Sequence, residues 1–221
     1  MAQIIPALIV SDENPENDFK ELKAGFKKLQ PFLAEFDNWV QIDITDGKFV
    51  PTKTNINSED LRYFTEQTNV EFHLMVEKPE EIVGQWVRLG PKRVIVHIEV
   101  VVDIKKLIDI CRENNVEIGL ALNPETSLIL IEPWISAVDL ILFLGVHPGR
   151  GGQEFIPEVL DKIKSLRQNF PNVKIGIDGG IRLTNIEELK NAGVNVFVIG
   201  SGILKAPDIG KTIGELKEKI K

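Results

Sequence analysis

The stretch Gln41-Ile42-Asp43-Ile44-Thr45-Asp46-Gly47 places acidic side chains at the end of an apolar run that begins at Trp39. Side chains alternate between the two faces of a strand, so Gln41 and Asp43 share one face. A carboxylate in such a run is costly to bury unless it is paired, hydrogen-bonded or bound to a metal. The stretch therefore predicts a buried strand that carries a polar group to the loop at its end.

Similar apolar runs recur along the whole chain. Most are rich in Val and Ile without sustained polar alternation, which is typical of parallel strands covered on both faces. The predicted strands are 4–10, 39–44, 70–76, 93–99, 117–123, 140–146, 174–178 and 196–200.

Helical patterns separate these strands. One apolar stripe runs through Phe19, Leu22, Phe26, Leu29 and Leu33. Asp103 is a predicted N-cap, Thr184 opens a segment with capping-box spacing, and Gly193 is placed to end that helix. The weakest segment is 127–135, which contains Pro133.

Eight strand–helix units in 221 residues predict a single-domain (β/α)8 TIM barrel, an α/β fold, over residues 1–221. An open doubly wound sheet is the alternative, but the chain has no Gly-x-Gly-x-x-Gly after the first strand.

Composition narrows the class of protein. A net charge of −7 argues against a nucleic-acid partner or an anionic membrane surface. The single cysteine, Cys111, cannot form an internal disulfide, and its place on a helical apolar stripe predicts an inert core residue. No apolar run approaches the roughly 18 residues needed to cross a bilayer, and the first ten residues resemble a strand more than a signal peptide. We expect a cytoplasmic protein.

Polar groups at strand ends predict one shared site. If their strand faces point inward, Gln41, Asp43, His73 and Asp178 converge at the C-terminal mouth of the barrel. Asp43 and Asp178 would then form an acid/base pair, and His73 would offer a nitrogen to a divalent metal. The alternatives are that each Asp caps a nearby loop and that His73 is a hydrogen-bonded core residue. We expect His97 to be a packing residue, whereas His147 fits either interpretation.

Three glycine-bearing elements predict an anion site, because glycine lets backbone N–H groups approach a phosphate closely. Ordinary turn formation is the alternative for any one of them. The strand-six loop, 148–153, also has the flexibility of a lid. The candidate phosphate or substrate residues are Gly149, Gly151, Gly152, Gly179, Gly180, Gly200 and Ser201, with Met75 on the strand face of His73.

Several stretches together resemble the ribulose-phosphate 3-epimerase family. The resemblance spans Pro6 to Pro207, and its most specific stretches are 43–51, His73-Leu74-Met75, Val96-His97-Ile98-Glu99, Asn123-Pro124, 148–155 and Asp178-Gly179-Gly180. It implies interconversion of D-ribulose 5-phosphate and D-xylulose 5-phosphate. By this match Asp43 and Asp178 carry protons, and a divalent metal (Zn, Fe or Mn) bound by Asp43, His73 and Asp178 stabilises the enediolate. The resemblance also implies a small phosphorylated sugar as partner and is consistent with a homo-oligomer.

The chain departs from the family pattern on the active face. Gln41 stands where the family has a histidine metal ligand, and an amide oxygen is a weaker donor for zinc-like ions. We therefore expect the metal site, with Gln41 as a tentative fourth ligand, to be weak or absent. Ala7, Thr45 and Arg150 replace residues typical of the family, and 52–55 also differs.

These departures leave an alternative function open: a catalytically reduced or substrate-shifted member of the family that binds a phosphorylated metabolite. A related decarboxylase or aldolase is a third alternative. It is disfavoured because the sequence 43–46 has no lysine and strand 140–146 has none for a Schiff base.

Overall fold

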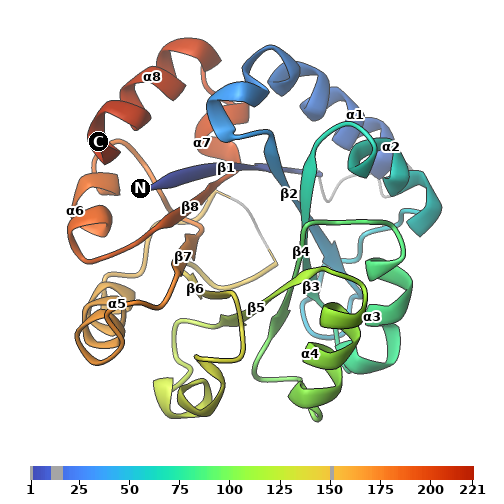
Figure 1. Cartoon of the computed structure of the whole chain (residues 1–221). Coiled ribbons are helices and arrows are strands. Elements are labelled where there is room, and N and C mark those ends of the chain that lie inside the picture. The colour runs from blue at the N-terminus through green and yellow to red at the C-terminus, as the bar shows by residue number, and fades with distance from the viewer. Residues whose placement is uncertain (1, 11–16, 150–151) are drawn as a thin grey trace.

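A computed structural model describes residues 2–10, 17–149 and 152–221, and these form a closed barrel of eight parallel strands. Figure 1 shows the strands at the centre and the helices around them, with the first and last strands side by side. The strands are β1 (Gln3–Leu8), β2 (Trp39–Thr45), β3 (Asn69–Met75), β4 (Arg93–His97), β5 (Glu117–Leu122), β6 (Leu140–Leu144), β7 (Ile175–Asp178) and β8 (Val196–Ile199). The predicted (β/α)8 fold is confirmed.

Helices follow the strands, and most bury an apolar face against the barrel. The α-helices are α1 (Asp18–Leu29), α2 (Arg62–Thr65), α3 (Pro79–Val87), α4 (Ile104–Glu113), α5 (Glu158–Asn169), α6 (Ile186–Asn191), α7 (Ser201–Leu204) and α8 (Ile209–Ile220). The 3₁₀ helices are η2 (Gln30–Phe36), η3 (Ser58–Leu61), η4 (Leu128–Leu130) and η5 (Glu132–Trp134). Among the described residues, none of these helices has the length and apolarity that a bilayer span requires.

Local details differ from the sequence expectations in three places. The stripe that reaches Leu33 is not one helix, because α1 ends at Leu29 and the tighter η2 begins at Gln30, with Pro31 in its first turn. After β5 the chain forms only η4 and η5, in the segment expected to be weakest. The capping box at Thr184 is wrong: Asn185 is the N-cap residue of α6, and its Oδ1 accepts a hydrogen bond from the Arg182 N–H at 2.8 Å. By contrast, Asp103 caps α4 as predicted, through the Lys106 N–H.

The barrel interior alternates large and small side chains. At Gly176 an added Cβ would lie 2.8 Å from Leu142 Cδ1, and at Gly119 it would lie 3.0 Å from Ile95 Cγ1. A side chain at either position would press on its large neighbour on the adjacent strand, so glycine leaves room for Leu142 and Ile95. The buried apolar residues of this interior cluster are Ile5, Ala7, Ile95, Ala121, Leu140, Leu142, Leu144, Val196 and Val198.

A charged cluster fills the barrel at the N-terminal ends of the strands. The fully buried Arg93 donates from Nη1 to Glu71 Oε2 at 2.7 Å and from Nε to Glu117 Oε2 at 2.8 Å. Its guanidinium also lies over the Trp39 ring, 4.7 Å from the centroid. Burial raises the pKa of Glu71 to about 7, although the Arg93 charge opposes this shift. This end of the barrel is a closed ion-paired layer, so the polar groups at the other end form a separate site.

Candidate functional site

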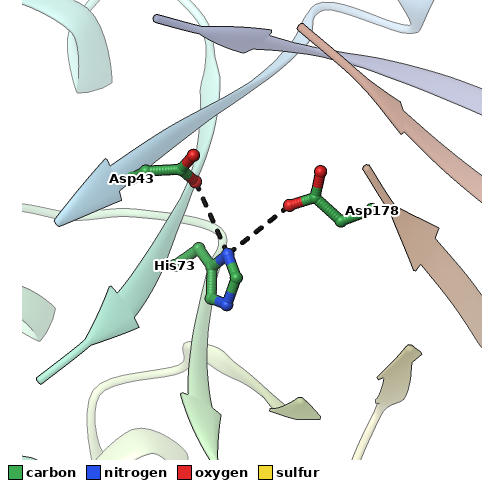
Figure 2. A group of neighbouring side chains, drawn as sticks. All are labelled: Asp43, His73 and Asp178. Atoms are coloured by element: carbon green, nitrogen blue, oxygen red, sulfur yellow. Dashed lines mark ion pairs between the residues drawn. The ribbon is translucent and has the colours of Figure 1, made fainter. Parts of the chain in front are cut away.

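Three ionisable side chains meet at the C-terminal mouth of the barrel. Asp43 of β2 lies in register with His73 of β3. Asp178 is the last residue of β7, which is separated from β2 by β8 and β1. His73 Nδ1 lies 3.5 Å from Asp43 Oδ1 and 3.5 Å from Asp178 Oδ2. Figure 2 shows the two carboxylates approaching this one nitrogen from different sides. The structure thus brings together Asp43 and Asp178, which lie 135 positions apart in the sequence.

Gln41, two residues before Asp43 on β2, links the two carboxylates by hydrogen bonds. It is fully buried, and its Nε2 donates to Asp43 Oδ1 and to Asp178 Oδ2, both at 2.8 Å. Its Oε1 is buried without a hydrogen-bond partner. The amide therefore presents its N–H groups, not its oxygen, to the two carboxylates.

Burial and the short carboxylate contacts shift the proton affinities of this group. Burial by itself would lower the pKa of His73, but its contacts with Asp178 and Asp43 outweigh burial and raise the pKa to about 9. Burial raises the pKa of Asp178, and the contact with His73 only partly offsets this. A carboxyl group with a raised pKa is suited to carry a proton near neutral pH.

The residues present fit a divalent cation. One ligand atom each from Asp43, His73 and Asp178 lies within 4.8 Å of the other two. His73 Nδ1 is buried without a hydrogen-bond partner, as is Gln41 Oε1. Two carboxylate oxygens and one imidazole nitrogen are ligands that zinc, iron and manganese accept in proteins. The fourth predicted ligand, Gln41, offers its amide oxygen only if the side-chain amide turns over.

A cavity of about 510 Å³ opens above these side chains. Its wall contains most of the predicted substrate residues: Met75, Gly149, Gly152, Gly179, Gly180, Gly200 and Ser201. Gly151 and Arg150 lie outside the described residues. Asp43, His73 and Asp178 also line the cavity, so the candidate acid/base groups and the glycine elements face one space.

The glycines after β7 have a steric reason to be glycine. Gly180 has φ +69°, and a Cβ there would lie 2.7 Å from the Phe155 Cα. Gly179 has φ +94°, and a Cβ there would lie 2.5 Å from Val146 Cγ2. At this rim Gly180 therefore packs against the Phe155 backbone and Gly179 against the Val146 side chain.

Several cavity residues were not among the predicted site residues. Lys53, Thr54 and Arg182 line the same space. Thr54 Oγ1 lies 3.0 Å from Thr45 Oγ1 and accepts from the Thr45 N–H at 3.1 Å. Loop residues have no periodic pattern that would place them. The usable signals are the position of these loops after β2 and β7, where barrel enzymes carry their sites, and, for 52–55, the departure from the family pattern.

The remaining histidines and the cysteine differ in their surroundings. His147 lines the cavity and pairs with Glu125 at the surface, 3.3 Å from Nδ1 to Oε1. His97 is fully buried, as a packing residue would be, yet its Nε2 lies 2.9 Å from His73 Nε2. Cys111 is fully buried and free, so the core prediction for it is confirmed.

Comparison with known proteins identifies relatives of the whole chain. The family model described as "Ribulose-phosphate 3 epimerase family" matches residues 16–204. The ribulose-phosphate 3-epimerase of Schizosaccharomyces pombe is 30% identical over 223 residues, covering 99% of this chain and 94% of the relative. That of Synechocystis is 34% identical over 208 residues, covering 89% and 90%.

Solved structures share the fold at lower sequence identity. KGPDC from Streptococcus mutans has a TM-score of 0.70 at 15% identity, covering 100% of this chain and 97% of its own. A tryptophan synthase alpha-subunit from Pyrococcus furiosus has a TM-score of 0.67 at 15% identity, covering 99% and 96%. These likenesses establish the barrel alone, whereas the family model and the sequence relatives show that the chain belongs to the ribulose-phosphate 3-epimerase family.

Proposed function

We propose that the protein interconverts D-ribulose 5-phosphate and D-xylulose 5-phosphate by proton transfer at C3. The observation that carries the proposal is the pair of carboxylates, Asp43 and Asp178, from β2 and β7, that face one histidine nitrogen at the base of a cavity. Both relatives described above are named for this activity. The family resemblance and the site geometry support the same reaction.

Asp43 and Asp178 are the proposed proton carriers. One carboxylate removes the C3 proton, and the other, in its acid form, delivers a proton to the opposite face of the same carbon. The proton count of the enzyme is unchanged over a turnover, but the two aspartates exchange their protonation states. The raised pKa of Asp178 supports its holding a proton before one direction of the reaction.

The surrounding donors orient the pair and face the developing negative charge. The Gln41 Nε2 group bridges both carboxylates, and His73 Nδ1 lies beside both. A divalent metal held by Asp43, His73 and Asp178 would supply Lewis-acid stabilisation of the enediolate oxygens when bound. The glycine rim, with Gly179, Gly180 and Gly200, would bind the substrate phosphate through backbone N–H groups.

Weak metal binding is part of this proposal, and the orientation of the Gln41 amide supports it. Where a histidine would point a lone pair at the cation, the Gln41 amide directs N–H groups to two of the cation's ligands. These hydrogen bonds occupy acceptor sites on Asp43 Oδ1 and Asp178 Oδ2, the same oxygens that face His73. A purified protein that holds stoichiometric zinc or iron after dialysis against a weak chelator would contradict weak binding.

The catalytic proposal is tested by epimerisation in D₂O with Asp43→Asn and Asp178→Asn. We expect the wild type to place deuterium at C3 of both epimers. Each variant should lose turnover by about 10²–10⁴-fold, the usual contribution of a positioned acid or base. Each should retain slow exchange into only one epimer, and the two variants should retain opposite ones. Full exchange into both epimers by either variant would exclude two-base catalysis.

A second candidate function is a substrate-shifted member that binds a different phosphorylated metabolite. The observation favouring it is that departures from the family pattern meet at the cavity wall: Ala7 lines it, and Thr45 is hydrogen-bonded to Thr54 there. Absence of C3 exchange in the wild type, together with saturable binding of a pentose phosphate by calorimetry, would favour this second function.

A further inference from the structure

A chain of buried hydrogen bonds extends behind His73, away from the cavity. His73 Nε2 lies 2.9 Å from His97 Nε2, and His97 Nδ1 lies 3.3 Å from Glu99 Oε2. The two rings are nearly parallel, with an interplanar angle of 13° and centroids 5.0 Å apart, so their nitrogens meet edge to edge. Phe49 packs on the His97 ring at a centroid distance of 4.6 Å. The histidines are fully buried, so each ring nitrogen depends on its neighbour for a hydrogen bond.

Glu99 is held as an acceptor at the far end of this chain. Its Oε1 accepts from the Asn123 N–H at 2.7 Å and from the Thr126 hydroxyl. Burial would raise the pKa of Glu99, but its hydrogen bonds with His97, Thr126 and the Asn123 N–H outweigh burial and lower it. The ionised carboxylate therefore needs a donor at Oε2, and the group facing Oε2 is His97 Nδ1.

The acceptor at one end fixes every hydrogen bond along the chain. A neutral imidazole donates from one nitrogen and accepts at the other, so a proton on His97 Nδ1 leaves Nε2 of this buried ring as the acceptor. His73 must then donate from Nε2. The reverse direction would set a His97 lone pair against the Glu99 carboxylate, two acceptors 3.3 Å apart.

We propose that Glu99 is a positioning residue that acts through His97 to keep a proton on Nε2 of His73. Nδ1 of His73 is then the nitrogen left to Asp43, to Asp178 and to a divalent cation. The use of Nδ1 by a cation rests on the proposed function, but the hydrogen-bond directions do not. Residues behind a metal-binding histidine commonly set its tautomer, and their loss typically lowers metal affinity by about 10–100-fold.

The substitution Glu99→Gln is designed to reverse the chain. The glutamine Oε1 can still accept from the Asn123 N–H and from Thr126, which directs its NH₂ group at His97 Nδ1. His97 must then accept at Nδ1 and donate from Nε2, so Nε2 of His73 becomes an acceptor and any proton on His73 lies on Nδ1. The matched control is Glu125→Gln, which removes the carboxylate partner of the surface His147.

Long-range ¹H–¹⁵N NMR of protein labelled at its three histidines reads these proton positions directly. In the metal-free wild type we expect a protonated Nδ1 and a bare Nε2 on His97. Glu99→Gln should exchange the two, and Glu125→Gln should shift only the His147 signals. A wild-type His97 that carries its proton on Nε2, or a Glu99→Gln spectrum with the His97 pattern unchanged, would overturn the proposal.

Zinc titration by competition with a chromophoric chelator gives a second readout. We expect Glu99→Gln to weaken Zn²⁺ binding by about 10–100-fold relative to wild type, and Glu125→Gln to change it less than twofold. Equal Zn²⁺ affinity in Glu99→Gln and wild type would overturn the proposal. If the wild type takes up no measurable Zn²⁺, the NMR spectra of the metal-free proteins decide alone. A wild type with the expected spectrum but no C3 exchange would refute the proposed reaction and leave this inference intact.

Discussion

Arg93→Met tests whether the charged layer at the N-terminal end of the barrel depends on its cation. Arg93 and Glu71 both have side chains 0% exposed, with Nη1 and Oε2 2.7 Å apart. Removing one partner of a buried ion pair costs about 3–5 kcal/mol, because the remaining charge is uncompensated. Glu117, the other partner, is 42% exposed and regains water, so the loss of the Arg93–Glu117 ion pair adds about 0–1 kcal/mol. We expect the free energy of unfolding to fall by about 3–5 kcal/mol.

The penalty should grow as the pH rises. Burial raises the pKa of Glu71 from 4.5 to about 7 despite the opposing Arg93 charge. A folded pKa above the unfolded value means that the Glu71 contribution to stability is full below pH 4.5 and is lost as the pH rises to about 7. Without Arg93 the folded pKa is higher still. The loss in the variant then continues above pH 7, by up to about 1.4 kcal/mol for each pH unit, whereas the wild-type loss levels off.

Urea denaturation at pH 6, 7 and 8, followed by circular dichroism and tryptophan fluorescence, measures these changes. The double variant Glu71→Gln/Arg93→Met should recover much of the stability, because no buried charge is left unpaired. Arg62→Met is the matched control, since the Arg62–Glu59 pair is 43% and 65% exposed and should contribute about 0–1 kcal/mol. If Arg93→Met costs no more than Arg62→Met, or if its cost is the same at every pH, the reasoning is refuted.

Three further predictions follow from the site and the core. Gln41→His should tighten Zn²⁺ binding at least tenfold in a chelator competition assay, because an imidazole lone pair replaces N–H groups; unchanged affinity would count against weak binding by Gln41. Gly180→Ala should lower stability more than Gly152→Ala in thermal melts. Both glycines have positive φ, but only the new Cβ at Gly180 meets a neighbour, the Phe155 backbone at 2.7 Å, whereas the one at Gly152 meets nothing within 4 Å. Cys111, whose pKa burial raises to about 12, should react with a thiol reagent at pH 8 only in denaturant; rapid reaction of the native protein would show that this core opens.

The sequence alone determined the barrel. Eight apolar runs at regular spacing have the composition of strands covered on both faces, and hydrophobic periodicity is a local property that each segment carries by itself. The same alternation placed Gln41 and Asp43 on one strand face, and the structure has them on the inner face of β2 with their side chains in contact. Element ends were less well predicted: α6 begins after Asn185, whose side chain accepts from the Arg182 N–H and makes no capping hydrogen bond to the helix.

Only the tertiary structure decided how the polar groups meet. The approach of Asp178 to His73 depends on closure of all eight strands, since β7 reaches β2 and β3 across β8 and β1. The orientation of the Gln41 amide and the contact between His73 and His97 are likewise set by neighbours on other strands. Such contacts leave no periodic trace in the sequence, because the hydrogen bonds of a buried polar side chain are chosen by whatever partners the closed barrel brings within reach.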